Sequence, residues 1–399
     1  LDEESYLAIA GQLDPSLPYD WWRPWPPWNG DQEADAFVYA HPPLFLIWVW
    51  IWTQQATPDP EMIRGLKIAL ALPWAALLGW SVGFLAQKYT RRPWMAGLAW
   101  LLAPITLLGL QRGLMPDLML TSLSTLAVVG WTQGLRPSKR DPSWGWLCIG
   151  GLALGMAVLT KYPALVLVPA LLIHGRALGR LRISLPFWWA FGVVWVGVEL
   201  WLWSVYGRPH LWEVLTRADE IARGSMGGRT LGMMTRLFLG ISALFLLPHA
   251  TKKGMLVLGL VTLGTTAWGL NTSTPLHWLL PLTVMAGLGV VSLAMLAMEV
   301  IGSRGDEERI DLLLGSWGLL IALGVILGHN FSAPRYLLPL MVPLAIIGTR
   351  VAERVPETRR LWWLGVVLQA LLALTVTHGE HRFARASDEA AIALSERQS

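Results

Sequence analysis

Residues 145–173 read GWLCIGGLALGMAVLTKYPALVLVPALLI, an apolar run interrupted by one charged residue, Lys161. A membrane-spanning α-helix needs about 20 predominantly apolar residues. The run is too long for one span, and the lysine is followed by Tyr162 and Pro163. The stretch therefore predicts two spanning helices, at 145–160 and 161–175, that meet in a turn at Lys161.

Similar apolar runs recur on both sides of this stretch. Of the 399 residues, 54% are hydrophobic and only 15% are charged, against about 25% charged in soluble domains. We therefore expect an all-α polytopic membrane protein with about twelve transmembrane helices. Ten spans join the two above: 64–87, 94–112, 117–133, 184–206, 235–249, 254–271, 276–299, 311–328, 334–352 and 361–378.

The flanking regions differ from the bundle at 64–378. Residues 1–63 are expected to form a loop on the outer face, with an acidic motif at its start. Within it Leu44–Trp52 is short for a span and is bounded by prolines, which predicts an interfacial helix. Residues 379–399 are a polar outer-face tail, the start of a possible soluble portion. The polar beginning also predicts a preceding helix outside this sequence.

Basic residues set the expected orientation. They concentrate in the loops at 88–92, 136–140, 174–182, 252–253 and 350–360. Short loops rich in Lys and Arg are retained in the cytoplasm, and the loop at 304–309, which is mixed in charge, falls on the same side as these five. The remaining loops are expected outside. The net charge of +4 comes from these short loops, which argues against nucleic-acid binding. One cysteine, Cys148, excludes an intramolecular disulfide framework and a cysteine-based metal site.

Three polar residues stand out inside or beside the spans. Asp117 follows Pro116 at a helix start, where a carboxylate gains about 0.3–1 kcal/mol from the helix dipole; a functional role is the alternative. Lys161 either extends its ammonium to the outer surface or binds a phosphate. Glu199 lies within 184–206, where an unpaired charge is costly, so it should face a cavity or a partner.

Five short motifs occur in order along the chain. They are Asp2-Glu3-x-x-Tyr6-Leu7-x-Ile9-Ala10, His41-Pro42-Pro43-Leu44, Met115-Pro116-Asp117, Leu159-Thr160-Lys161-x-Pro163 and Pro334-Arg335-Tyr336-Leu337-Leu338-Pro339. In this order and spacing the chain resembles the GT-C glycosyltransferases, in particular bacterial relatives of protein O-mannosyltransferases and of lipid A aminoarabinose transferases.

The resemblance implies a GT-C-like bundle in the bacterial inner membrane, with an active site on the periplasmic side. It implies an inverting transferase that takes a sugar from a polyprenyl-phosphate donor to a lipid, glycan or protein acceptor. Catalytic carboxylates would be Asp2, Glu3 and Asp117. We expect the donor phosphate to meet Lys161, Arg335 and His41. For Arg335 the alternative is an interfacial anchor, and for His41 it is a loop cap or a ligand of a metal or of the acceptor. Glu199, for which a structural role is the alternative, and Tyr336 are expected to line the cavity. No cofactor is certain; a divalent metal is possible.

Two other functions fit the same pattern. A transporter or lipid flippase would place charged residues and broken helices near the bilayer midplane, whereas the polar residues here gather at one face, with Glu199 as the exception. A non-catalytic subunit of a membrane complex would keep the fold without the activity. Sugar release from a polyprenyl-phosphate donor would separate these alternatives.

Overall fold

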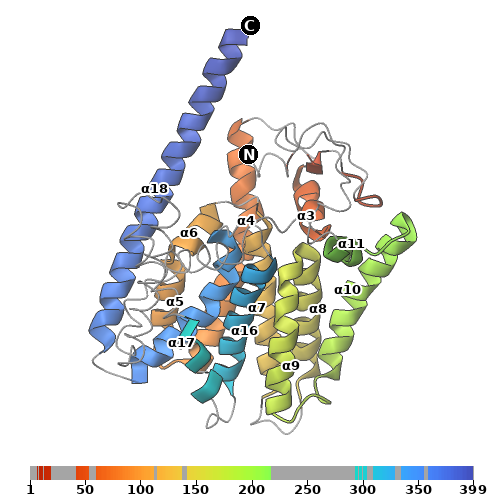
Figure 1. Ribbon diagram of the computed structural model, residues 1–399, viewed down its shortest axis with the longest axis vertical. Helices are drawn as coiled ribbons and strands as arrows, with labels where there is room; N and C mark the ends of the chain where they lie inside the picture. The colour runs from red at the N-terminus through yellow and green to blue at the C-terminus, as the bar shows by residue number, and fades with distance from the viewer. Residues whose placement is uncertain are drawn as a thin grey trace, which may run out of the picture.

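The computed structural model describes the following residues of the chain: 7, 9–11, 13–18, 42–53, 60–111, 115–136, 142–216, 293–294, 296–298, 300–302, 309–328, 334–354 and 358–398. The spans expected at 235–249 and 254–271, and most of 276–299, lie outside this part. Within it every regular element is a helix (Figure 1), which confirms the all-α prediction.

The helices follow the apolar runs. The elements are α3 (Leu44–Thr53), α4 (Pro60–Tyr89), α5 (Pro93–Leu101), α6 (Pro104–Gln111), α7 (Pro116–Gly134), α8 (Trp144–Thr160), η2 (Tyr162–Val166), α9 (Leu167–Ala177), α10 (Leu185–Tyr206), α11 (His210–Thr216), α16 (Ile310–Gly328), η6 (Pro334–Leu337), α17 (Leu338–Arg354) and α18 (Thr358–Gln398). Most boundaries lie within a few residues of the predicted ones.

Helix α7 is the centre of the bundle. All of its residues except Leu126 are buried, and it packs against α4, α8 and α17. Helix α8 in turn packs against α10. Glycines permit this close approach: a Cβ added to Gly130 of α7 would stand 2.5 Å from the Cα of Gly150 in α8. Small residues at such contacts are typical of helix packing in membranes.

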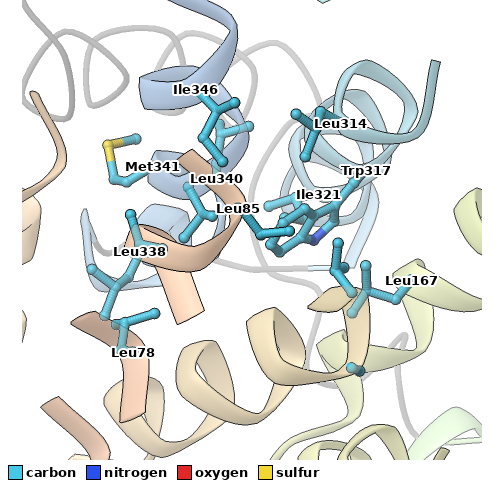
Figure 2. Close-up of a cluster of buried hydrophobic side chains, with 14 of the residues drawn as sticks. Leu78, Leu85, Leu167, Leu314, Trp317, Ile321, Leu338, Leu340, Met341 and Ile346 are labelled. Carbon is cyan, nitrogen blue, oxygen red and sulfur yellow. The ribbon is translucent and has the colours of Figure 1, made fainter. Parts of the chain in front are cut away.

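A second group of apolar side chains joins the two halves of the sequence. Leu78 and Leu85 of α4 lie in one cluster with Trp317 of α16 and with Leu340 of α17 (Figure 2). The two α4 residues are more than two hundred positions from the other two along the chain, yet all four are buried. The cluster therefore fixes α16 and α17 against the N-terminal helices, and so fixes the position of η6, which leads directly into α17.

Three helices in the described residues are long and apolar enough to cross a membrane: Gly65–Tyr89, Leu185–Tyr206 and Trp362–Gly379. Large apolar side chains on α10, such as Trp189 and Val193, point away from the protein core and are 72% and 61% exposed. A surface of this kind suits lipid rather than water. The helix predicted at Leu44–Trp52 is present as α3, and its ten residues are too few to span. Its interfacial position stays a prediction.

Two of the predicted spans differ in detail from the helices of the structure. The segment 94–112 is divided into α5 and α6, which are bent by 67°. Pro104 begins α6 and cannot donate the N–H that would continue α5. The segment 361–378 is part of a longer helix, α18, of 41 residues. Figure 1 shows α18 continuing well beyond the rest of the bundle, so no break separates the expected tail from the last span.

The basic loops meet at one end of the bundle. The Lys88 Nζ donates to the carbonyl of Thr132 at 3.4 Å, and the Arg350 Nη1 donates to that of Tyr89 at 2.8 Å. The Arg180 Nη1 donates to the carbonyl of Arg136 at 2.9 Å. The bundle therefore has one basic end, as the loop pattern predicted. Which side of a membrane this end faces stays a prediction.

Candidate active site

The end of the bundle opposite these basic loops holds a buried ion pair. Asp117 lies in the first turn of α7, and Lys161 directly follows the last residue of α8. Because α7 and α8 run antiparallel, these two positions meet, with the Lys161 Nζ 2.8 Å from the Asp117 Oδ1. The side chains are 5% and 3% exposed. Each charge also has the sign that its helix end favours.

Local structure fixes both partners. Pro116 stands in the first turn of α7, where its missing N–H would have no helical partner. At Lys161 the backbone is extended, with φ −166°, and the 3-10 turn η2 begins at the next residue. The chain thus turns at the lysine, as predicted, and directs its side chain inward. The ammonium therefore does not extend to the surface, which excludes one of the two interpretations of Lys161.

Tyr336 completes this group. It belongs to η6, and the Lys161 Nζ lies 4.3 Å from the centre of its ring. A cation over an aromatic face is attracted by about 0.5–2 kcal/mol, depending on desolvation. Three of the five motifs, around Asp117, Lys161 and Tyr336, are therefore brought together from distant parts of the sequence. We call these three residues the ion-pair site.

A polar cluster lies beside the ion-pair site, one residue along from Lys161. The Tyr162 hydroxyl donates to the Glu199 Oε1 at 2.8 Å and lies 2.5 Å from the His210 Nδ1. The Leu211 N–H donates to the Glu199 Oε2 at 3.3 Å. Since a tyrosine hydroxyl has one proton, the network is satisfied when His210 carries its proton on Nδ1 and donates to the tyrosine oxygen.

Glu199 has the partners that its apolar surroundings required. It also contributes to the lining of an apolar hollow of about 300 Å³ between α10 and α11, with Trp195, Trp203 and Trp212. Its position differs from the prediction in one respect. Contact with Tyr162 places it near the end of the bundle that holds Lys161, rather than apart from the other polar residues.

Tyr162 and His210 were missed as site residues. In the sequence Tyr162 occupies the variable position between Lys161 and Pro163, and aromatic residues are common at membrane interfaces. His210 was one of many polar residues in a long loop. In the structure it begins α11 and is fully buried. Only its burial distinguishes it, and a single sequence does not reveal that.

Other predicted site residues are not placed by the structure. Asp2, Glu3 and His41 lie outside the described residues, and so does the side chain of Arg335, whose backbone is in η6 beside Tyr336. Within the described ranges no three His, Cys, Asp or Glu side chains gather as metal ligands. The roles of these residues and a bound metal stay predictions.

The apolar helical bundle is that of a polytopic membrane protein. A family model for dolichyl-phosphate-mannose-protein mannosyltransferases matches residues 47–215. This range includes Asp117, Lys161, Glu199 and His210. No curated protein matches the chain.

The fold is similar to that of a solved membrane protein, ArnT. ArnT from Cupriavidus metallidurans, whose crystal structure contains undecaprenyl phosphate, superposes with a TM-score of 0.53 at 17% sequence identity. The superposition covers 83% of this chain and 53% of that one, so the present chain spans about half the length of ArnT. The family match and the shared fold together support the resemblance to the GT-C superfamily.

Proposed function

We propose that this protein is a membrane glycosyltransferase that moves a sugar from a polyprenyl-phosphate donor to an acceptor on the periplasmic side of the bacterial inner membrane. The observation that carries the proposal is the buried pair of Lys161 and Asp117, with Tyr336 over the lysine. Burying opposite charges costs several kcal/mol per ion in desolvation and is a poor way to gain stability. A charged group retained at a membrane boundary is usually functional.

The proposed reaction is a single displacement at the anomeric carbon. An acceptor hydroxyl oxygen forms the new bond, the bond from the anomeric carbon to the phosphate oxygen breaks, and polyprenyl phosphate leaves. A single displacement inverts the configuration of the sugar. The proton of the hydroxyl passes to a carboxylate, for which Asp2 is our first candidate and Glu3 the second. A positioned base of this kind contributes about 10²–10⁴-fold.

Lys161 is proposed to compensate charge on the donor phosphate. In the resting protein its ammonium is balanced by Asp117. An arriving phosphate would compete with Asp117 for this ammonium, whose attraction for an anion is stronger at the low dielectric of a buried site. Arg335 follows Pro334 in the same short turn as Tyr336 and is proposed as a second phosphate ligand, because its planar fork matches phosphate oxygens. His41 is the third.

Asp117 is proposed to hold the lysine in place until the donor arrives. Removal of Asp117 would leave a buried ammonium without its counter-ion. The Asp117 carboxylate instead fixes the Lys161 ammonium at one point. The polar cluster of Tyr162, Glu199 and His210 lies next to this point and is proposed to line the cavity. A dry, positioned site of this kind is what transfer from a lipid phosphate requires.

The test is turnover by the purified protein. A polyprenyl-phosphate sugar is supplied with lipid, glycan or protein acceptors, and released polyprenyl phosphate is separated by chromatography. We expect release that depends on an acceptor and a product of inverted anomeric configuration by NMR. The control is the Asp2→Asn protein. Donor movement across a vesicle membrane without bond cleavage would instead identify a flippase, and donor binding without either would identify a non-catalytic subunit.

A further inference from the structure

A polar pocket of about 510 Å³ lies at the basic end of the bundle, between the last turn of α4 and the end of α17. Lys88 is one of its lining residues, and the Lys88 Nζ reaches the carbonyl of Thr132 at the C-terminal end of α7. Asp117 is in the first turn of the same helix. At a rise of 1.5 Å per residue, Thr132 and Asp117 are about 22 Å apart along the axis of α7. This pocket is therefore distinct from the ion-pair site.

Cations dominate the lining. Lys88, Arg91, Arg350 and Arg354 contribute four positive charges, and Glu353 contributes one negative charge. The Glu353 carboxylate accepts the backbone N–H groups of Arg91, at 3.0 Å, and of the next residue, at 2.6 Å. With Asp311 behind the pocket included, a formal charge of two positive units remains. The pocket is therefore suited to an anion.

Two of the three arginines, Arg350 and Arg354, are held in position before any anion arrives. The Arg350 Nε lies 2.8 Å from the Asp311 Oδ1, and the Arg354 Nη2 lies 2.8 Å from the Asp311 Oδ2. The Arg350 Nη1 also donates to the carbonyl of Tyr89. Guanidinium groups fixed in this way lose little side-chain entropy on binding, and their geometry matches phosphate oxygens.

Neighbouring tryptophans indicate the level of the pocket relative to the membrane. Trp94, three residues after Arg91, and Trp363 of α18 have ring centroids 5.6 Å apart. They are 48% and 42% exposed. Exposed tryptophans of a membrane protein gather at the level of the lipid headgroups. Arg91 of the cationic pocket is three residues from Trp94, so the pocket is expected at the level of the phospholipid phosphates.

We propose that this pocket binds the phosphate of an anionic phospholipid headgroup. Basic pockets between transmembrane helices on the cytoplasmic side are suited to such headgroups. The lipid phosphate would contact residues of both α4 and α17, two helices that also pack against each other. Its binding would therefore stabilise the junction of the first and last parts of the bundle.

The experiment uses the full chain in nanodiscs and in detergent. The pocket variant is Lys88→Gln/Arg91→Gln, which leaves Asp311 and its two arginines intact. The matched control is Arg359→Gln/Arg360→Gln, which removes the same charge from the start of α18, outside the pocket. Lipid retained after purification is counted by native mass spectrometry, and thermal unfolding is followed with added phosphatidylglycerol or phosphatidylcholine.

We expect phosphatidylglycerol, but not phosphatidylcholine, to remain bound to the parent protein and to raise its unfolding temperature. In the pocket variant the phosphatidylglycerol affinity should fall about tenfold or more, while the control variant keeps it. Equal losses in both variants would indicate general surface charge and overturn the proposal. Unchanged affinity in the pocket variant would also overturn it. Equal stabilisation by inorganic or glycerol phosphate would identify a soluble anion in place of the lipid.

Discussion

The buried lysine is the residue on which the candidate active site depends. Lys161 has an anionic partner on one side and an aromatic ring on the other, and both come from other helices. Breaking a buried pair by removal of one partner costs about 3–5 kcal/mol. Loss of activity in a single variant would therefore not separate a functional role from a structural one.

A double variant makes that separation. Lys161→Met should lower the unfolding temperature and abolish turnover, because Asp117 is left buried without its counter-ion. Asp117→Asn/Lys161→Met removes both charges and should recover most of the stability, since apolar or neutral groups often replace a buried pair without loss. Turnover should stay absent. A double variant that regains turnover with its stability would show that the pair serves only the fold.

At the chain start, Asp2→Asn keeps the shape and hydrogen-bonding capacity of the side chain but cannot accept a proton. We expect turnover to fall by about 10²–10⁴-fold, with normal membrane insertion and near-normal donor affinity. Glu3→Gln should have a smaller effect. A fully active Asp2→Asn protein together with an inactive Glu3→Gln protein would show that Glu3, and not Asp2, is the general base.

Arg335 offers a test of phosphate recognition. Arg335→Ala should weaken donor binding much more than Arg335→Lys, which keeps a positive charge but not the bidentate geometry. A charge-assisted hydrogen bond is worth about 1.5–3 kcal/mol, or roughly 10–150-fold in affinity. The measurement is binding of polyprenyl phosphate to each purified variant. Equal binding by the alanine variant and the parent would leave Arg335 as an interfacial anchor.

Single residues of the site could be predicted from sequence, but their contacts could not. Asp117 and Lys161 could be identified as candidate site residues because a charge in or beside an apolar run is rare. Their pairing depends on the antiparallel packing of α7 and α8, which a sequence does not state. The cluster of Tyr162, Glu199 and His210 was missed for the same reason, because it forms only when α10 and α11 lie beside η2.

Among the elements, glycine contacts decide how closely the helices approach. A Cβ added to Gly151 of α8 would overlap the backbone carbonyl oxygen of Phe187 in α10. Backbone atoms cannot rotate aside as a flexible side chain does. The helices would have to separate, and Tyr162 and Glu199 lie on the chain segments that this movement would affect.

We therefore expect Gly151→Ala to lower stability by about 1–3 kcal/mol, the usual cost of overpacking. The control is Gly192→Ala in α10, where an added Cβ meets nothing within 4 Å. Thermal unfolding in one detergent compares the two. A Gly151→Ala protein as stable as the control would mean that α8 and α10 adjust without cost.

Helix existence was predicted well and helix continuity less well. Long apolar runs specify a helix, so α4, α7, α8 and α10 were expected nearly at their observed bounds. The bend between α5 and α6 was not, although Pro104 is visible in the sequence. A proline only sometimes breaks a transmembrane helix, since neighbouring helices can satisfy the freed backbone groups.

For the molecule as a whole, orientation is the main prediction. If the basic end faces the cytoplasm, Ser138→Cys should react with an impermeant thiol reagent only after cells are permeabilised, whereas Ser225→Cys should react in intact cells. The background is Cys148→Ser, which removes the single native thiol. Labelling of position 138 in intact cells would show that the orientation of the bundle is the opposite of the predicted one.

Helix α18 gives the molecule a rigid rod. At 1.5 Å per residue its 41 residues extend about 60 Å. It begins next to Arg354 at the basic end and passes along the bundle, so its far end lies on the side of the ion-pair site (Figure 1). Its first part is held by the bundle, since α18 packs against α6 and the Gln369 Nε2 donates to the carbonyl of Ala99 at 2.6 Å. The last turns project past the bundle (Figure 1), so they would stand above the region where an acceptor is proposed to approach.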